Sequence, residues 1–162
     1  MITDHNIALA RSADASAISA MSRDYIERGL GWDWTPTRVL RSIRDRSTNV
    51  AVVRDGGPLL GFGIMKYGDD TAHLHLLAVH RSMRRKGVGT ALLLWLEQTA
   101  RAAAIERVRL EARASNDLAR AFYRSRGYHE TERLSGYYRG AEDAVRLEKL
   151  LWTDTGTGLV PE

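Results

Sequence analysis

The sequence predicts a single α/β domain, because stretches with helical periodicity alternate along the chain with stretches patterned like strands. Two further observations agree with this fold class. The length of 162 residues fits one domain of ordinary size, and a hydrophobic content of 44% is sufficient for a core. No internal repeat or low-complexity linker divides the chain. We expect one domain over residues 1–152 and a loose tail over residues 153–162.

The first third of the chain predicts two helices and then two strands. A helical stripe over residues 13–27 is formed by Ile18, Met21, Tyr25 and Ile26. A second helix is expected in WTPTRVLRSIRD, with Thr35 as its N-cap and Pro36 in its first turn. The runs NVAVVRD and LLGFGIMKY are typical of strands, and DGGP between them is typical of a turn.

The rest of the chain continues the alternation. A turn at YGDD precedes a third strand, AHLHLLAV. A long helix follows, marked by apolar residues at Val88, Ala91, Leu92, Trp95, Leu96 and Ala103. RVRLEARA alternates charged and apolar residues as a half-buried strand does, and a short helix is expected from Asp117 to Arg126, with Gly127 as its terminator. YHETERL and EDAVRLEKLL predict two further strands.

Composition restricts the functional classes. The absence of cysteine excludes disulfides, thiolate metal sites and cysteine nucleophiles. There is no apolar run near the ~18 residues that span a membrane, and from the first residues we expect no secretion signal. We therefore expect a cytoplasmic protein. The net charge is +4, and nearly all the cations are arginine. This composition favours a codon bias. It also fits a polyanionic ligand such as nucleic acid, a membrane surface or a phosphorylated cofactor.

The stretch MRRKGVGTALL, residues 83–93, lies between a predicted strand and the long helix. The first amides of a helix have no intrahelical partners and carry the positive end of the dipole, and glycine lets an anion approach them. Arg84, Arg85 and Lys86 add full charges. The stretch thus favours a phosphate or pyrophosphate site; the alternative is a solvated basic turn with a glycine cap. It matches neither a P-loop nor a dinucleotide fingerprint, since Leu92 stands where the third glycine would be.

Three blocks resemble the GCN5-related N-acetyltransferase (GNAT) family. LAVHRSMRRKGVGTALL resembles motif A, whose loop reads Gln/Arg-x-x-Gly-x-Gly/Ala, and Arg84, Gly87 and Gly89 fill those places. LEARASNDLARAFYRSRGY resembles the later strand–loop–helix, through Asn116, Tyr123, Gly127 and Tyr128. YYRGAEDAVRL is similar to the end of the ribosomal-protein alanine acetyltransferase branch. His80 and Arg81 depart from the acidic–proline pair that is common after the strand.

The resemblance implies a GNAT fold: a mixed, mostly antiparallel sheet of six or seven strands with about four helices on both faces. Its third and fourth long strands splay apart, and acetyl-CoA lies between them. The backbone of Leu77, Ala78 and Val79 would pair with the pantetheine arm and the acetyl carbonyl. Asn116 would bond the pantetheine or neighbouring backbone, and Arg84 would stand at the entrance of the phosphate loop. The pyrophosphate would be wrapped by Arg85, Lys86, Gly87, Val88, Gly89 and Thr90.

Acetyl transfer to an amine needs a base and an acid. The amine must lose a proton held with a pKa of ~8 for an α-amine or ~10.4 for lysine, and the leaving thiolate must gain one. Tyr123 falls where the family places its catalytic tyrosine; the alternative is an aromatic packed beside Phe122. Glu111 lies off the apolar face of its strand and matches the glutamate that the alanine acetyltransferase branch uses as proton acceptor. Its alternative is an ion pair with Arg109 or Arg113.

Two histidines and four aromatic residues complete the candidate set. His73 and His75 share one strand face and are rival bases; His75 is also a candidate acceptor contact, and with no cysteine or carboxylate nearby we expect no metal site. Four aromatic residues would contact the acceptor: Trp32, Trp34, Tyr137 and Tyr138. For the two tryptophans the alternative is one core anchor and one surface aromatic.

The leading hypothesis is an acetyl-CoA-dependent N-acetyltransferase with no metal. The branch that it resembles acetylates protein or peptide N-terminal α-amines, while a polyamine, amino acid or antibiotic stays open as acceptor. A silent acyl-CoA-binding module is the second hypothesis, against which Glu111 and Tyr123 argue. A nucleic-acid-binding module is the third, and it predicts cations over a continuous face rather than one loop. We expect no nucleic-acid or membrane partner and a monomer or homodimer.

Overall fold

The computed structural model describes residues 6–152, which form two compact units. The first unit comprises the chain up to Lys66 together with Leu74–Thr99, and the second comprises Tyr67–His73 and the chain from Ala100 onward. Strand β4 (Thr71–Val79) and helix α3 (Val88–Ala102) contribute residues to both. The seven strands follow the hydrogen-bonded order β1-β2-β3-β4-β5-β7-β6. The tail predicted at residues 153–162 lies outside the described residues, and the single-domain boundary stays a prediction.

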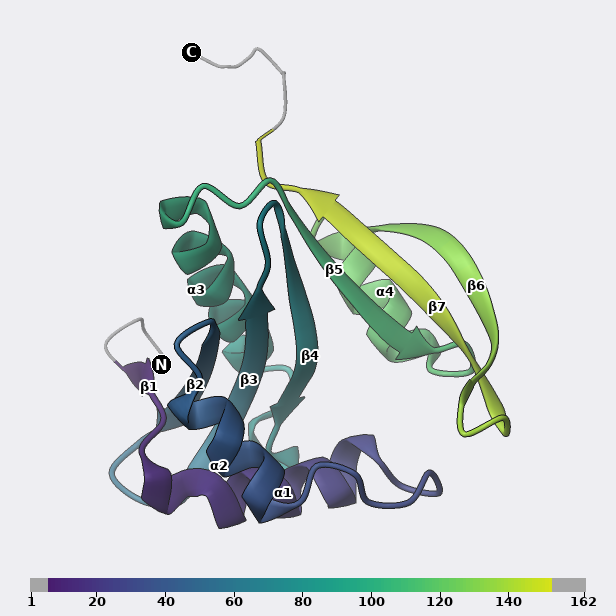
Figure 1. Ribbon diagram of the computed structural model, residues 1–162. Coiled ribbons are helices and arrows are strands. Elements are labelled where there is room, and N and C mark those ends of the chain that lie inside the picture. The colour runs from purple at the N-terminus through teal and green to yellow at the C-terminus, as the bar shows by residue number, and fades with distance from the viewer. Residues whose placement is uncertain (1–5, 153–162) are drawn as a thin grey trace. The chain divides into compact units, whose positions relative to one another are not determined.

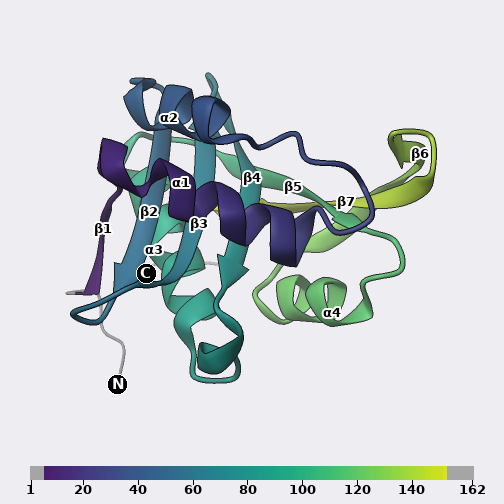
Figure 2. The ribbon, with the colours of Figure 1, turned by 90° about the horizontal axis from the view of Figure 1, so that it is seen from below.

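The first unit is a layer of strands covered on both faces by helices (Figures 1 and 2). Strands β1 (Ile7–Leu9), β2 (Thr48–Arg54) and β3 (Leu59–Tyr67) pair antiparallel in that order. Helices α1 (Ala15–Met21) and α2 (Pro36–Arg44) cover one face of these strands, and α3 covers the other. Thr35 caps α2 as predicted, since its hydroxyl accepts a hydrogen bond from the amide of Arg38 at 3.4 Å.

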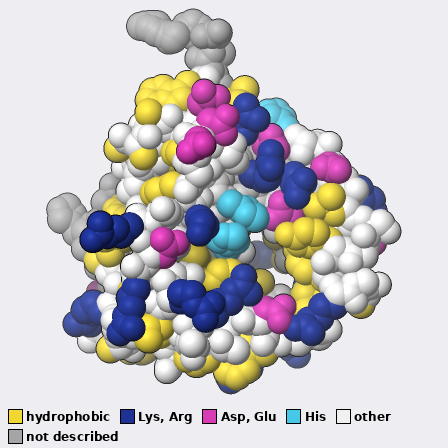
Figure 3. Space-filling view, viewed as in Figure 1, with side chains coloured by type: hydrophobic (Ala, Val, Ile, Leu, Met, Phe, Trp, Pro, Cys, Tyr) yellow, Lys and Arg dark blue, Asp and Glu magenta, His cyan; other side chains and the backbone are white. Residues whose placement is uncertain are grey.

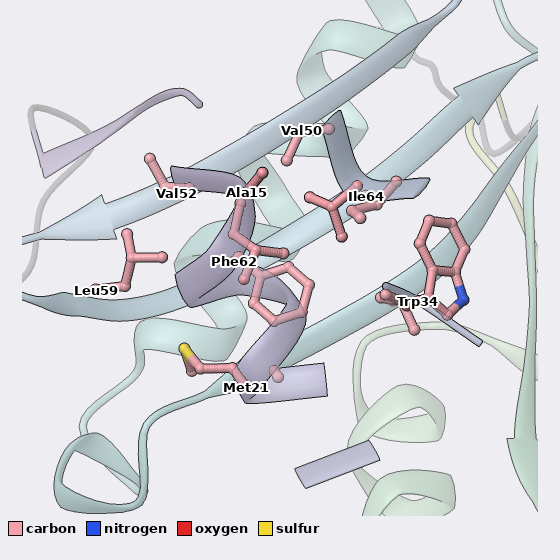
Figure 4. Close-up of a cluster of buried hydrophobic side chains, with 12 residues drawn as sticks. Ala15, Met21, Trp34, Val50, Val52, Leu59, Phe62 and Ile64 are labelled. Carbon is pink, nitrogen blue, oxygen red and sulfur yellow. The ribbon is translucent and has the colours of Figure 1, made fainter. Parts of the chain in front are cut away.

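Alternation along β3 explains how α3 is positioned. Phe62 and Ile64 point into the core beneath α1 and α2, which Figure 4 shows. The intervening glycines face α3: a methyl group at Gly61 would lie 3.1 Å from a Leu92 methyl, and one at Gly63 would lie 2.8 Å from a Leu96 methyl. Because the contact at Gly63 would be shorter than atoms normally approach and the one at Gly61 would be tight, glycine on this face of β3 allows α3 to pack closely against the strand.

The connection between α1 and α2 is held by one buried carboxylate. Helix α1 continues into a π-helical turn, Ser22–Ile26, and Glu27 follows it. Glu27 accepts hydrogen bonds from the Asp33 amide at 2.6 Å, the Trp34 amide at 3.2 Å and the Ser22 hydroxyl at 2.7 Å. A buried charge requires such partners, and here they fix the backbone that presents Trp34.

The second unit is a three-stranded antiparallel arrangement with one helix. Strand β5 (Arg107–Arg113) pairs with β7 (Glu142–Leu150), which pairs with β6 (His129–Tyr138), and α4 (Asp117–Ser125) precedes β6. Residues on β5 alternate in burial as predicted, so that Leu110 is buried while Glu111 lies on the other face.

The predicted fold class is confirmed: the chain is α/β, with a seven-stranded sheet and four α-helices among residues 6–152. Strand β1 was not predicted from the sequence, and one continuous helix was predicted over residues 13–27. That segment is a 3₁₀ turn (Ser12–Asp14), then α1, then the π-helical turn. No helix within residues 6–152 is long and apolar enough to cross a membrane.

Candidate active site

The basic loop before α3 has the backbone of an anion site. Gly87 has a φ of 81°, and Arg85 is also left-handed with a φ of 64°. The first intrahelical bond of α3 runs from the Ala91 amide to the Gly87 carbonyl at 3.0 Å. The amides of Val88, Gly89 and Thr90, in the first turn of α3, therefore lie before the first intrahelical hydrogen bond, as the N-terminal amides of a helix do.

These residues suit the phosphates of acetyl-CoA. Arg84, Arg85 and Lys86 are all exposed in the loop, so three cations stand beside the amides of the first turn of α3. An anion in this position gains from the charges, from hydrogen-bond donors and from the helix dipole. In the described part of the chain, no group of three or more histidines, aspartates or glutamates is placed to hold a metal ion.

Tyr25 contacts the residues of this loop and those just before it, and these contacts were not predicted from the sequence. The Arg81 and Arg84 guanidinium carbons lie 5.9 Å and 5.7 Å from the centre of the Tyr25 ring. The Arg81 amide donates to the Tyr25 hydroxyl at 3.5 Å, and the His80 ring meets the Tyr25 ring edge-on at 6.1 Å. The sequence showed Tyr25 only as part of a helical stripe, because nothing in local spacing relates it to a loop 56 residues away.

Glu111 is the centre of a hydrogen-bonded cluster in the second unit. Its side chain is only 5% exposed. Oε1 lies 2.6 Å from Nε2 of His73 and accepts from the Tyr137 hydroxyl at 3.3 Å, and Oε2 accepts from Nε of Arg146 at 2.9 Å. The sequence alternative of an ion pair with Arg109 or Arg113 is wrong, because those arginines pair with Glu148 and Glu142, each at 2.9 Å.

The cluster keeps Glu111 ionised. Burial of the carboxyl acts to raise its pKa, but hydrogen bonds and charges from His73 and Arg146 outweigh burial and lower the pKa from 4.5 to about 2. Glu111 is thus a buried carboxylate at neutral pH, able to attract a cation and to accept hydrogen bonds. Its low pKa also makes it a weak base.

The second unit also holds the candidate tyrosines Tyr123 and Tyr138, of which Tyr123 is buried and Tyr138 is partly buried. Tyr123 is 9% exposed, and its ring packs against Phe122 and Tyr128 with centroids 5.1 Å and 5.7 Å away. Burial, with a smaller effect of Tyr138, raises the pKa of Tyr123. Burial, with added effects of Tyr137 and Glu111, raises the pKa of Tyr138 as well. Tyr123 and Tyr138 therefore keep their protons at neutral pH, as proton or hydrogen-bond donors must.

Trp34 and His75 lie together in the first unit. Trp34 is 9% exposed and belongs to the core, while Trp32 is 40% exposed, which matches the alternative of one anchor and one surface aromatic. The His75 ring lies 5.6 Å from the Trp34 ring, and the two residues line one pocket.

The predicted residues fall into two groups. The first unit holds the β4 candidates from His75 to Val79, the basic loop and the residues around Trp34. The second unit holds His73, Glu111, Asn116, Tyr123, Tyr137 and Tyr138. Asn116 is the N-cap of α4, and its side chain accepts from the Ala119 amide at 3.1 Å. Of the rival bases, His73 contacts Glu111, while His75 contacts Trp34.

Comparison with known proteins shows the family. A profile of the Acetyltransferase (GNAT) family matches residues 17–128. The chain belongs to this family. The predicted membership is confirmed, and the chain is an acyltransferase that uses acetyl-CoA as acetyl donor.

Several GNAT relatives are similar over much of the chain. An uncharacterised N-acetyltransferase of Methanocaldococcus jannaschii is 40% identical over 57% of this chain, and the match spans 60% of that protein. The ribosomal protein bS18-alanine N-acetyltransferase of Escherichia coli is 30% identical over 74% of this chain and 82% of its own length. The structure of Ard1 from Thermoplasma volcanium superposes with a TM-score of 0.79 at 27% identity, covering 91% of this chain and 97% of Ard1.

The Glu111 cluster of this GNAT protein predicts a pH-dependent stability difference. Because the folded pKa is below the unfolded value of 4.5, the carboxylate stabilises the fold above pH 4.5, and this contribution is lost as pH falls toward about 2. At neutral pH it amounts to about 3 kcal/mol by linkage. Glu111→Gln should therefore lower the free energy of unfolding at pH 7 by an amount that shrinks in acid, measured by urea titration.

The matched control is Glu132→Gln. Glu132 bonds the same Arg146 at 3.1 Å but is exposed, so its removal should change stability by less than about 1 kcal/mol. A stability difference for Glu111→Gln that is constant from pH 7 to pH 3 would contradict the ionised cluster.

Proposed function

We propose that this protein transfers an acetyl group from acetyl-CoA to the N-terminal α-amine of a protein or peptide. The observation that carries the proposal is the buried Glu111 carboxylate, whose bonds to His73 and Arg146 lower its pKa to about 2. A weak base serves an α-amine, whose pKa is ~8, better than a lysine side chain at ~10.4, because part of the α-amine is already neutral near pH 7.5. The names of relatives agree, since one acetylates a ribosomal-protein alanine and another is an N-alpha-acetyltransferase of Mycobacterium tuberculosis, 32% identical over 72% of this chain and 75% of its own length.

The charges around the cluster also favour a single amine over a polyamine. Each carboxylate on the neighbouring strands is paired with arginine: Glu130 with Arg120, Glu132 with Arg146, Glu142 with Arg113, Asp143 with Arg133 and Glu148 with Arg109. A polyamine would need several unpaired carboxylates to replace its hydration. This surface offers no such surplus within residues 6–152.

Acetyl-CoA supplies the activated acetyl group, and the protein's residues move two protons. The buried Glu111 carboxylate attracts the amine, and the proton that the attacking nitrogen releases is taken up by the hydrogen-bonded His73–Glu111 pair through the imidazole of His73, which lies 2.6 Å from Glu111. Tyr137, which already donates to Glu111, holds the approaching group. Tyr123 delivers a proton to the leaving sulfur; its raised pKa keeps the phenol protonated until negative charge develops. The loop from Arg84 to Thr90 holds the phosphates.

A competition assay tests the acceptor. Short lysine-containing peptides with free N-termini are compared with the same peptides carrying blocked N-termini, alongside spermidine and free amino acids, with acetyl-CoA as donor. We expect acetylation of the free peptides and at least about tenfold less of the blocked ones, since only the ε-amine remains there. Equal activity on blocked peptides, or activity on spermidine or free amino acids alone, would overturn the proposal.

A further inference from the structure

One face of α2 carries a stripe of arginines that the proposed reaction does not use. Arg38, Arg41 and Arg44 are spaced three residues apart, so they share one side of the helix, while Val39 and Ile43 pack into the core on the other side. Figure 3 shows Lys and Arg side chains gathered over the region where Figure 1 draws α2. A solvated helix face would also be polar, so the stripe alone shows nothing about a ligand.

The stripe borders a pocket of about 700 Å³ in the first unit. Trp34 and His75 line it, and they are joined by Arg38, Arg41, Arg44, Lys66 and Asp45, among others. Lys66 pairs with Asp45, with its Nζ 3.3 Å from Oδ2, so the excess positive charge of the pocket comes from the three arginines. Asp45 is already engaged, since it accepts from the Ser47 amide at 3.0 Å and from the Thr48 hydroxyl at 2.8 Å. The pocket therefore carries a surplus of positive charge.

Arg41 and Arg44 differ from the arginines on the strand faces of the second unit. In the second unit, arginines on the strand faces pair with carboxylates, as Arg109 does with Glu148. Within residues 6–152, no carboxylate lies within ion-pair distance of Arg41 or Arg44, both of which are exposed. Arg38 is held in place differently: its guanidinium carbon stacks 3.8 Å from the centre of the Trp34 ring, which Glu27 and the core keep fixed. A planar guanidinium on an aromatic face is pre-organised to bind carboxylates.

We propose that this pocket binds acidic side chains of the acceptor polypeptide, C-terminal to the amine that is acetylated. The inference rests on the proposed function, because Trp34 and His75, which line the pocket, are among the residues expected to contact the acceptor. Charge complementarity selects the ligand: exposed guanidinium groups on a rigid aromatic floor match Glu and Asp side chains and repel basic ones. The protein should then prefer acceptors with Asp or Glu in the residues that follow the N-terminus.

Binding of a non-substrate peptide tests the pocket independently of catalysis. The probe is a fluorescein-labelled, N-acetylated octapeptide with glutamates at positions 3 to 6, compared by fluorescence anisotropy with the same peptide carrying lysines. We expect the glutamate peptide to bind at least about tenfold more tightly in low salt and to weaken as salt rises. Arg41→Glu should lower its affinity about tenfold. Arg46→Glu makes the same charge change at an exposed residue outside the pocket and should change it less than about twofold.

Each outcome separates the two proposals. If the blocked acidic peptide binds through Arg41 but free peptides are not acetylated, the proposed function fails and the anion pocket stands. If peptides are acetylated equally well whether acidic or basic, and Arg41→Glu changes neither binding nor KM, the pocket proposal fails alone. A short single-stranded RNA that binds more tightly than the acidic peptide and is lost with Arg41→Glu would also overturn it, in favour of a nucleic-acid ligand.

Discussion

Replacing Gly89 by aspartate should lower the affinity for CoA by about 100-fold or more, which corresponds to about 2.7 kcal/mol. Gly89 is the second residue of α3, within the turn whose amides precede the first intrahelical bond. A carboxylate there places negative charge where a pyrophosphate would bind and also occupies its space. The helix itself should tolerate the change, because an acidic residue in the first turn interacts favourably with the helix dipole. Calorimetric titration with CoA and a thermal melt of the same sample measure both effects.

Two variants isolate the cause. Gly89→Asn adds nearly the same volume without charge and should lose less affinity than Gly89→Asp. Gly57→Asp makes the identical substitution in the exposed turn between β2 and β3, where an added side chain meets nothing within 4 Å, and should leave CoA binding unchanged. An affinity that survives Gly89→Asp would mean that the phosphates bind elsewhere.

Helices and strands could be predicted from the sequence wherever apolar residues form a clear helical or strand pattern. Strand β3 begins and ends where the apolar run LLGFGIMKY does, and Thr35 with Pro36 marked the start of α2 correctly. Strand β1 was missed because it has only three residues, two of them exposed, so no alternation is visible. The π-helical turn after α1 has a tertiary cause as well, since Ser22 and the Asp33 and Trp34 amides gather around the Glu27 carboxylate.

The sequence indicated candidate residues for the site but not the partners that the structure gives them. Alternation on β5 placed Glu111 on the correct face, and it did so without indicating Arg146, which lies 35 residues away on β7. The register of β5 with β7 sets Glu111 opposite Arg146, and that register depends on the whole strand pair. The lowered pKa of Glu111 therefore could not be inferred from sequence, because it depends on hydrogen bonds from His73 and Arg146, and the role of Glu111 as general base stays a prediction.

Tyr123→Phe should lower turnover by about 100-fold or more with little change in CoA affinity, if Tyr123 protonates the leaving sulfur. The substitution keeps the ring, which packs between Phe122 and Tyr128, and removes only the hydroxyl. Because burial raises the pKa of Tyr123, the phenol remains protonated across the neutral range, and the variant's deficit should not depend on pH between 6 and 9. Steady-state kinetics at saturating acetyl-CoA over that range measure it.

Tyr128→Phe is the matched control for the loss of a buried hydroxyl. Tyr128 is 1% exposed and its ring lies 5.7 Å from the Tyr123 ring, so both variants remove one oxygen atom from the same aromatic cluster. If a hydroxyl in this cluster matters only for packing, the two variants should lose similar stability and both should retain turnover. If Tyr123 is the acid, only its variant loses turnover, and the loss should be larger for a donor whose leaving group is a stronger base, because such a group depends more on proton transfer. Retained turnover in Tyr123→Phe would assign Tyr123 to the core alone and require another proton donor, for which Tyr138, with its own raised pKa and its electrostatic influence on Tyr123, is the next residue to replace.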